Sequence, residues 1–105
     1  MQEHTKIISH LTDNIYSNIT LDDLCAKFNY SKAFLCKKFK EESGIPIMNY
    51  YNNLKIKEAT HLLKDKEHSV SYVAEILNFN SRYYFSKAFK RITGMSPAEY
   101  KKRIP

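Results

Sequence analysis

Residues 81–93 read SRYYFSKAFKRIT. On an α-helix, the apolar side chains of this stretch recur at i, i+3, i+4 and i+7 and form one stripe: Phe85, Ala88, Phe89 and Ile92. The same spacing two positions earlier forms a polar, cationic stripe: Tyr83, Ser86, Lys87 and Lys90. Arg82 and Arg91 add charge near the two ends, and no acidic residue interrupts the segment. The pattern is typical of a helix that packs on one side and enters the major groove of DNA with the other.

A second copy of this pattern lies about fifty residues upstream and favours the DNA interpretation over an ordinary surface helix with solvated lysines. The offset is 49 residues up to the turn and 50 beyond it, because Asn80 is an additional residue in the second turn. Aligned positions share their chemistry: Thr20 with Ser69, Leu24 with Val73, Asn29 with Asn78, Ser31 with Ser81, Phe39 with Phe89, Gly44 with Gly94 and Tyr50 with Tyr100. A short helix, a tight turn and a basic helix form a helix-turn-helix, which this sequence predicts twice.

The predicted fold class is all-α, with about seven helices in two helix-turn-helix subdomains joined by a long linker helix. Hydrophobic residues make up 43% of the 105 residues, which argues against disorder, and no alternating strand-like run occurs. Besides the quoted stretch, the expected helices are residues 2–18, 21–28, 31–43, 47–64 and 70–77, with a last short helix from Ser96 and Pro97 onward. The predicted domains are a first subdomain at 1–45, the linker helix at 46–65 and a second subdomain at 66–105. Ile8, Leu11 and Ile15 are expected on the buried face of the first helix.

The formal net charge of +6 is unevenly distributed. Residues 1–30 carry two basic and four acidic side chains, a balance of −2, whereas residues 31–105 carry 15 and 7, a balance of +8. Such asymmetry indicates a polyanionic partner. No apolar run is long enough to span a membrane, and the first residues lack the apolar stretch of a signal peptide, so a cytoplasmic protein without membrane contact is expected.

Two cysteines without a C-x-x-C motif predict neither a disulfide scaffold nor a zinc site, and no cofactor is expected. The sequence has no glycine-rich phosphate loop, no H-E-x-x-H and no carboxylate pair beside a base. It is therefore not expected to be an enzyme.

Two stretches carry a resemblance to a known family: ITLDDLCAKFNYS at residues 19–31 and VAEILNFNSRYYFSKAFKRITGMSPAEY at residues 73–100. Over about residues 5–102 the chain resembles the DNA-binding domain of the AraC/XylS family of transcription regulators. The sequence departs from the family pattern at Asn78, where glycine is usual, and at Cys25, where a small alanine is usual and a buried, inert thiol is expected.

The resemblance implies which side chains face DNA. In the first unit, the groove-facing residues would be Ala33, Cys36 and Lys37, with Lys32 and Lys40 towards phosphate. In the second unit, they would be Arg82, Tyr83, Ser86 and Lys87, with Lys90 and Arg91 towards phosphate. Arg82, Lys37 and Lys87 can donate hydrogen bonds to guanine. Ala33 and Cys36 offer only apolar contact, for instance to a thymine methyl group. The second helix is therefore expected to carry more of the hydrogen-bonded base readout.

The resemblance also implies a function and partners. The chain is expected to be a sequence-specific transcription regulator that binds double-stranded DNA, with two recognition helices in successive major-groove segments of an asymmetric site. RNA polymerase is a further expected partner, and family members usually attach this domain to a sensing or dimerisation domain. The chain is then either a free-standing regulator or a C-terminal piece. A helical interaction module that binds RNA or an acidic protein remains the alternative, and a redox-sensing Cys36 is a minor one. Target, effector and sign of regulation stay open.

Overall fold

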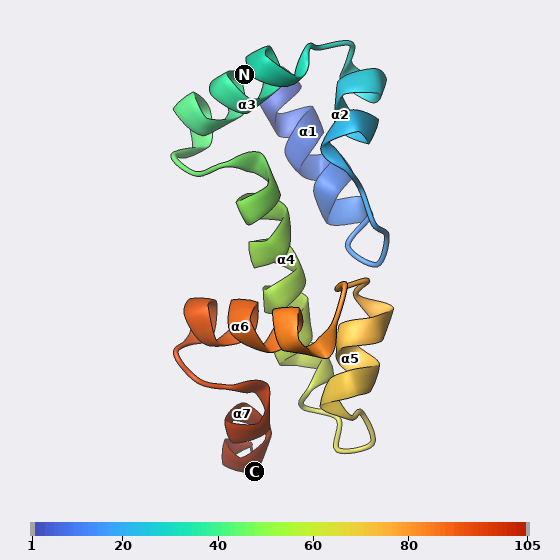
Figure 1. The fold of residues 1–105 in the computed structure, drawn as a ribbon, viewed down its shortest axis with the longest axis vertical. Coiled ribbons are helices and arrows are strands. Elements are labelled where there is room, and N and C mark those ends of the chain that lie inside the picture. The colour runs from blue at the N-terminus through green and yellow to red at the C-terminus, as the bar shows by residue number, and fades with distance from the viewer. Residues whose placement is uncertain (1, 105) are drawn as a thin grey trace. The chain divides into compact units, whose positions relative to one another are not determined.

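The computed structural model describes residues 2–104, and within this range it contains helices and no strand (Figure 1). The seven helices are α1 (Gln2–Asp13), α2 (Leu21–Phe28), α3 (Lys32–Ser43), α4 (Ile47–Leu62), α5 (Val70–Ile76), α6 (Arg82–Thr93) and α7 (Pro97–Arg103). The all-α prediction with about seven helices is confirmed. The chain forms two compact units, Met1–Asn52 and Asn53–Pro105, and α4 contributes residues to both.

Five of the helices between residues 2 and 104 begin at a side-chain cap. A hydroxyl oxygen accepts a backbone N–H of the first turn at each of five positions: Thr20, Ser31, Ser69, Ser81 and Ser96. At α2, the backbone N–H of Thr20 also donates to Asp23 Oδ2 at 2.9 Å, which completes a capping box. These hydrogen bonds from Thr20 lower the pKa of the Asp23 carboxyl.

The turns inside the two helix-turn-helix motifs have left-handed backbone. Asn29 and Asn78 both have φ of 59°, and they are the positive-φ residues other than glycine among the described residues. Asparagine tolerates this conformation better than most residues with a side chain, so Asn78 can take the place of the usual glycine. Gly44 and Gly94 end α3 and α6 with φ of 84° and 89°, where a Cβ would be strained.

Tyr51 organises the core of the first unit. It is 2% exposed, and its hydroxyl lies 2.6 Å from the carbonyl oxygen of Asn14 and 2.8 Å from that of Ser17. The hydroxyl also accepts the backbone N–H of Ile19 at 3.5 Å. Burial raises the pKa of Tyr51. These contacts hold the connection between α1 and α2 against α4.

The first helix is shorter than predicted, because α1 ends at Asp13 rather than at residue 18. The side-chain amide of Asn14 donates to the carbonyl oxygen of His10 at 2.8 Å. The Tyr51 hydroxyl lies within hydrogen-bonding distance of the carbonyls of Asn14 and Ser17, and the Asn14 carbonyl also accepts the backbone N–H of Ser17 at 3.1 Å, so the chain forms turns here instead of continuing the helix. The expected buried face is therefore only partly right. Ile7 and Leu11 are buried, whereas Ile8 and Ile15 are half-buried.

The second unit repeats this arrangement with different side chains. Lys101 occupies the position aligned with Tyr51, and its ammonium group donates to the carbonyl oxygen of His68, which aligns with Ile19. A neighbouring pair is also repeated. The rings of Tyr50 and Phe39 meet edge to face at 5.4 Å, and those of Tyr100 and Phe89 meet at 5.5 Å. The repeat therefore extends from sequence to packing.

Three further features differ from the predictions: the ends of two helices and the exposure of one side chain. Helix α4 ends at Leu62, two residues early, because the carbonyl of Leu62 accepts from the backbone N–H of Asp65 in the following turn. Helix α5 ends at Ile76, with Leu77 as its C-cap. Ile92, predicted on the apolar stripe of α6, is 37% exposed, whereas Phe85 and Phe89 of the same stripe are fully buried.

Lys55 is a buried cation that the sequence does not reveal. Its side chain is 3% exposed within α4, and Nζ donates to the carbonyl oxygen of Leu77 at 2.6 Å. The ammonium group lies 5.7 Å from the centroid of the Phe79 ring. Lys55 thus satisfies a carbonyl at the end of α5, where helical partners are missing. Burial lowers the pKa of Lys55 to about 8.

The depressed pKa of Lys55 predicts a pH dependence of stability. The unfolded chain holds this proton up to about pH 10.5 and the folded chain only to about pH 8, so folding is penalised at low pH and the penalty is released as pH rises. The free energy of unfolding should increase by about 1–2 kcal/mol between pH 8 and 9.5. Urea denaturation of wild type and Lys55→Met checks this, and an equal increase in both proteins would contradict it.

Candidate nucleic-acid interface

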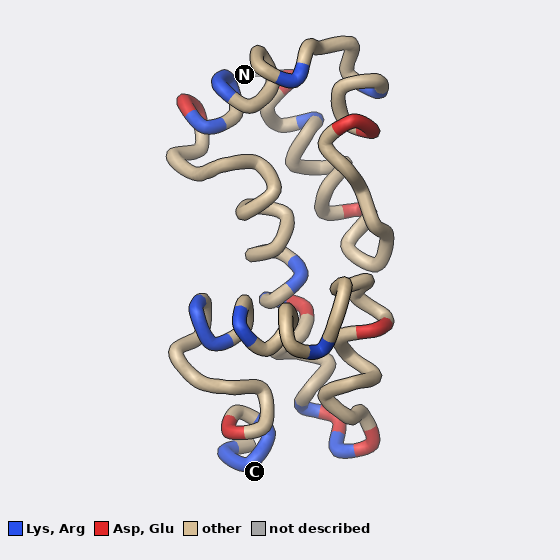
Figure 2. Tube along the Cα trace, in the orientation of Figure 1, with Lys and Arg blue, Asp and Glu red and all other residues tan. Residues whose placement is uncertain are grey.

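Helix α6 is held by its apolar stripe, which leaves its basic side to solvent. Phe85 and Phe89 are 0% exposed and Ala88 is 5% exposed, whereas Tyr83 on the other side is 72% exposed. The basic residues of the helix are exposed as well: Arg82, Lys87, Lys90 and Arg91. In Figure 2, α6 carries only basic charges along its length. The orientation predicted from the 3.6-residue period is therefore present.

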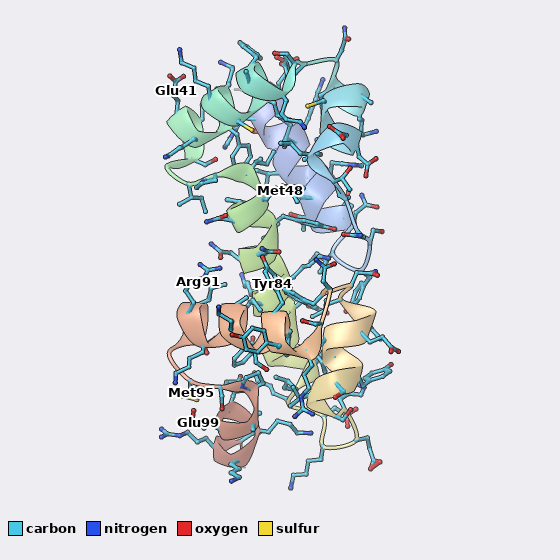
Figure 3. The ribbon with its side chains drawn as sticks, in the orientation of Figure 1. Glu41, Met48, Tyr84, Arg91, Met95 and Glu99 are labelled. Carbon is cyan, nitrogen blue, oxygen red and sulfur yellow. The ribbon has the colours of Figure 1, made fainter. Side chains whose placement is uncertain are left out.

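The exposed side of α6 combines cations with an aromatic ring. The ammonium group of Lys87 lies 5.3 Å from the centroid of the Tyr83 ring, one helical turn away. Two open hollows adjoin this pair, and both are also lined by Arg91, whose side chain extends outward from α6 in Figure 3. Ser86 and Lys90 line one of them, so five of the predicted residues lie together. Ser86 is half-buried, and its side chain is the shortest of these five.

Arg82 lies at the start of α6, and its side chain is hydrogen-bonded to a residue of α5. Its Nη1 donates to Ser71 Oγ at 3.3 Å, and both side chains are exposed. The guanidinium group has five N–H donors in total, so this contact leaves most of them available. The sequence predicts Arg82 as a DNA contact but gives no sign of its partner on the neighbouring helix.

Helix α3 is anchored by buried side chains in the same way as α6, but its predicted groove-facing residues include fewer hydrogen-bond donors. Leu35 and Phe39 are each 1% exposed and fix the helix on the core of the first unit. The predicted residues on the other side are exposed at Ala33, Lys37 and Lys40 and half-buried at Cys36. Lys32, the remaining predicted residue, is 61% exposed, and its ammonium group lies 3.3 Å from Asp22 Oδ1.

Each recognition helix also presents an exposed aromatic residue that the sequence predictions omit. Phe34 of α3 and Tyr84 of α6 are both 47% exposed. The ring of Tyr30 lies 4.9 Å from that of Phe34, and the ring of Phe79 lies 6.1 Å from that of Tyr84. Tyr30 aligns with Phe79, and Phe34 aligns with Tyr84, so each unit has one Tyr and one Phe in this pair, in opposite order. The alignment of the copies is the signal that could have found this pair.

Cys25 is not placed as the sequence suggests. Cys25 is half-buried rather than buried, because α2 fully buries only Leu24, on the side of the helix that faces the core. Cys36 is also a free, half-buried thiol. Within residues 2–104, no three His, Cys, Asp or Glu side chains are grouped as metal ligands would be. In the same range, no helix has the length and apolarity needed to cross a membrane.

A short helix, a left-handed turn and a basic helix anchored by two buried side chains define a helix-turn-helix protein, and this chain contains the arrangement twice. A family model described as a helix-turn-helix domain matches residues 24–103. The raffinose operon transcriptional regulatory protein RafR of Pediococcus pentosaceus is 32% identical over 97 residues, which are 92% of this chain and 35% of RafR. The chain belongs to the AraC-type helix-turn-helix family.

Solved structures share the fold. A probable AraC family transcriptional regulator from Rhodopseudomonas palustris superposes with a TM-score of 0.89 at 20% identity, over 99% of this chain and 98% of that one. The DNA-binding domain of AdpA, solved in complex with a target DNA, superposes with a TM-score of 0.86 at 21% identity, over 94% and 89% of the two chains. The chain spans about a third of the length of the curated relatives it matches.

The cap at Ser81 determines where the basic helix of the second unit begins. Its hydroxyl accepts the backbone N–H of Tyr84 at 3.0 Å. Ser81→Ala should lower the free energy of unfolding by about 1 kcal/mol, and Ser81→Asn, which keeps an acceptor, by much less. Urea denaturation followed by circular dichroism measures both. Equal stability of wild type and Ser81→Ala would show that the hydroxyl is not needed to start α6.

Proposed function

We propose that this chain binds a specific double-stranded DNA sequence as the DNA-binding part of a transcription regulator. The observation that carries the proposal is the exposed basic side of α6, fixed by the burial of Phe85 and Phe89 and repeated on α3. An α-helix of this kind fits the major groove. Membership of the AraC-type family supports the proposal. So do the similarity to RafR, a transcriptional regulatory protein, and to the DNA-binding domain of AdpA in complex with its target DNA.

The two recognition helices have different proposed roles. On α6, Arg82 and Lys87 would donate to guanine, Tyr83 and Ser86 would contact bases, and Lys90 and Arg91 would bind phosphate. On α3, Ala33, Cys36 and Lys37 would face the groove, and Lys32 and Lys40 would bind phosphate. Since the short side chains of Ala33 and Cys36 offer apolar contact rather than strong hydrogen bonds, α6 would carry more of the base readout.

The site on DNA would be asymmetric. Two non-identical motifs in one chain would enter successive major-groove segments, whereas a dimer with one motif per chain would favour a palindrome. The intact regulator would act in the cytoplasm, where its DNA lies. It would include a sensing or dimerisation domain, as the partial coverage of the relatives suggests, and RNA polymerase is a further proposed partner.

Duplex DNA and single-stranded RNA should be distinguished by fluorescence anisotropy at increasing salt. A groove-binding protein that neutralises several phosphates should lose affinity for the duplex steeply as salt rises, with a logarithmic slope of about −0.9 per phosphate contact. It should bind the duplex in preference to single-stranded RNA of equal length. Tighter binding to the RNA, or no duplex binding at all, would overturn the proposal in favour of an interaction module.

Base readout by α6 predicts a sequence-dependent effect of Lys87→Ala. A lost base contact should cost about 1–3 kcal/mol on a duplex selected for tight binding and much less on a random duplex. Lys66→Ala is the matched control, because Lys66 is an exposed lysine of the same unit outside α6. Anisotropy titrations of wild type and both variants on the two duplexes measure all six affinities. Equal losses on the selected and the random duplex would assign Lys87 to phosphate contact, and the same comparison applies to Arg82→Ala.

A further inference from the structure

In both units, the second residue of the short helix holds the first residue of the recognition helix. In the first unit, Asp22 Oδ1 lies 3.3 Å from Lys32 Nζ. In the second unit, Ser71 Oγ accepts a hydrogen bond from Arg82 Nη1 at 3.3 Å. Asp22 aligns with Ser71, and Lys32 aligns with Arg82, so the same contact is made twice with different chemistry.

The difference is one of charge. The carboxylate of Asp22 opposes the charge of Lys32, whereas the neutral hydroxyl of Ser71 orients Arg82 and leaves its positive charge uncompensated. The neighbouring carboxylate, Asp23, is engaged by the backbone N–H of Thr20 in the capping box and is not the ion-pair partner of Lys32. Within residues 2–104, Lys32 of the first unit is paired with an acid and the aligned Arg82 is not.

We propose that Asp22 is a positioning residue that restrains Lys32 and weakens the contribution of the first recognition helix to DNA affinity. The inference rests on the proposed function. In the second unit, Ser71 instead presents Arg82 to DNA in a fixed orientation. Asp22 and Ser71 together distribute affinity unequally between the two units.

The exposure of the pair allows it to act in this way. Lys32 is 61% exposed and Asp22 is 82% exposed, so the ion pair contributes little to folding and can open in water. When Lys32 binds a phosphate, however, Asp22 loses its partner, and its own negative charge is left near the backbone of the DNA. Each of these effects opposes the phosphate contact, and both come from the negative charge of Asp22, which Ser71 lacks.

Exchanging the residues between the aligned positions tests the inference. In Asp22→Ser, Lys32 should gain a phosphate contact, so binding should tighten about three- to tenfold at 0.1 M salt on selected and random duplexes alike. The logarithmic salt slope should steepen by about 0.9, as for one additional phosphate contact. Ser71→Asp should weaken binding by a similar factor and flatten the slope. Both residues already occupy the second position of a short helix, so the exchanged side chains suit that site.

Lys32→Ala separates a restraint on Lys32 from a general effect of charge. If Asp22 acts through Lys32, Asp22→Ser should change affinity much less in the Lys32→Ala background. Asp22→Asn keeps the shape of the side chain and should act as Asp22→Ser does, whereas Asp13→Asn removes the same charge from the end of α1 and should leave the salt slope unchanged. Circular dichroism melting checks that each variant is folded.

The outcomes distinguish the inference from the proposed function. If wild type binds no duplex, the proposed function fails and the inference fails with it. If wild type binds duplex but Asp22→Ser and Asp22→Asn leave affinity and salt slope unchanged, only the inference fails. A gain that persists in full in the Lys32→Ala background would also overturn it, since Asp22 would then repel DNA without restraining Lys32.

Discussion

The burial of two side chains, one helical turn apart, fixes the rotation of each recognition helix. On α6 these are Phe85 and Phe89, and on α3 they are Leu35 and Phe39, all between 0% and 1% exposed. Because a helix repeats every 3.6 residues, burying one stripe determines which residues face solvent. Serine caps begin both helices and left-handed glycines end them, so their lengths are fixed as well as their rotation. Every assignment of a DNA contact depends on this constraint.

The two units share a scaffold and differ in the chemistry of its exposed side. Three features recur at aligned positions: the edge-to-face aromatic pairs, the left-handed asparagines, and the hydrogen bonds from Tyr51 and Lys101 to backbone carbonyls ahead of the short helix. On the exposed side, α6 combines four basic residues with Tyr83, whereas α3 presents Ala33 and a half-buried Cys36 and pairs Lys32 with Asp22. A repeated scaffold with unequal surfaces suits recognition of two unlike halves of one DNA site.

The sequence predicts those parts of the fold and of the candidate interface that depend on residues close together in the chain. The sequence predicts helices that start at Ser31 and Ser81 and tight turns at Asn29 and Asn78. These features depend on residues within one or two helical turns, and the structure has them at these positions. Features that depend on distant residues were missed. The end of α1 is set by Tyr51, 37 residues beyond Asn14, and the cap of α5 by Lys55, 22 residues before Leu77. The partners of Lys32 and Arg82 on the short helices were missed for the same reason, whereas the exposed stripe of α6 followed from its period alone.

Selection of bound sites from a random duplex library tests the central claim most directly. Two different recognition helices in one chain should enrich a single non-palindromic site of about two helical turns, with unequal information in its two halves. A palindromic site would contradict the account, because it would mean that two copies of one motif contact the DNA. Failure to enrich any sequence would contradict it as well, because the basic side of α6 would then bind DNA only through its charge.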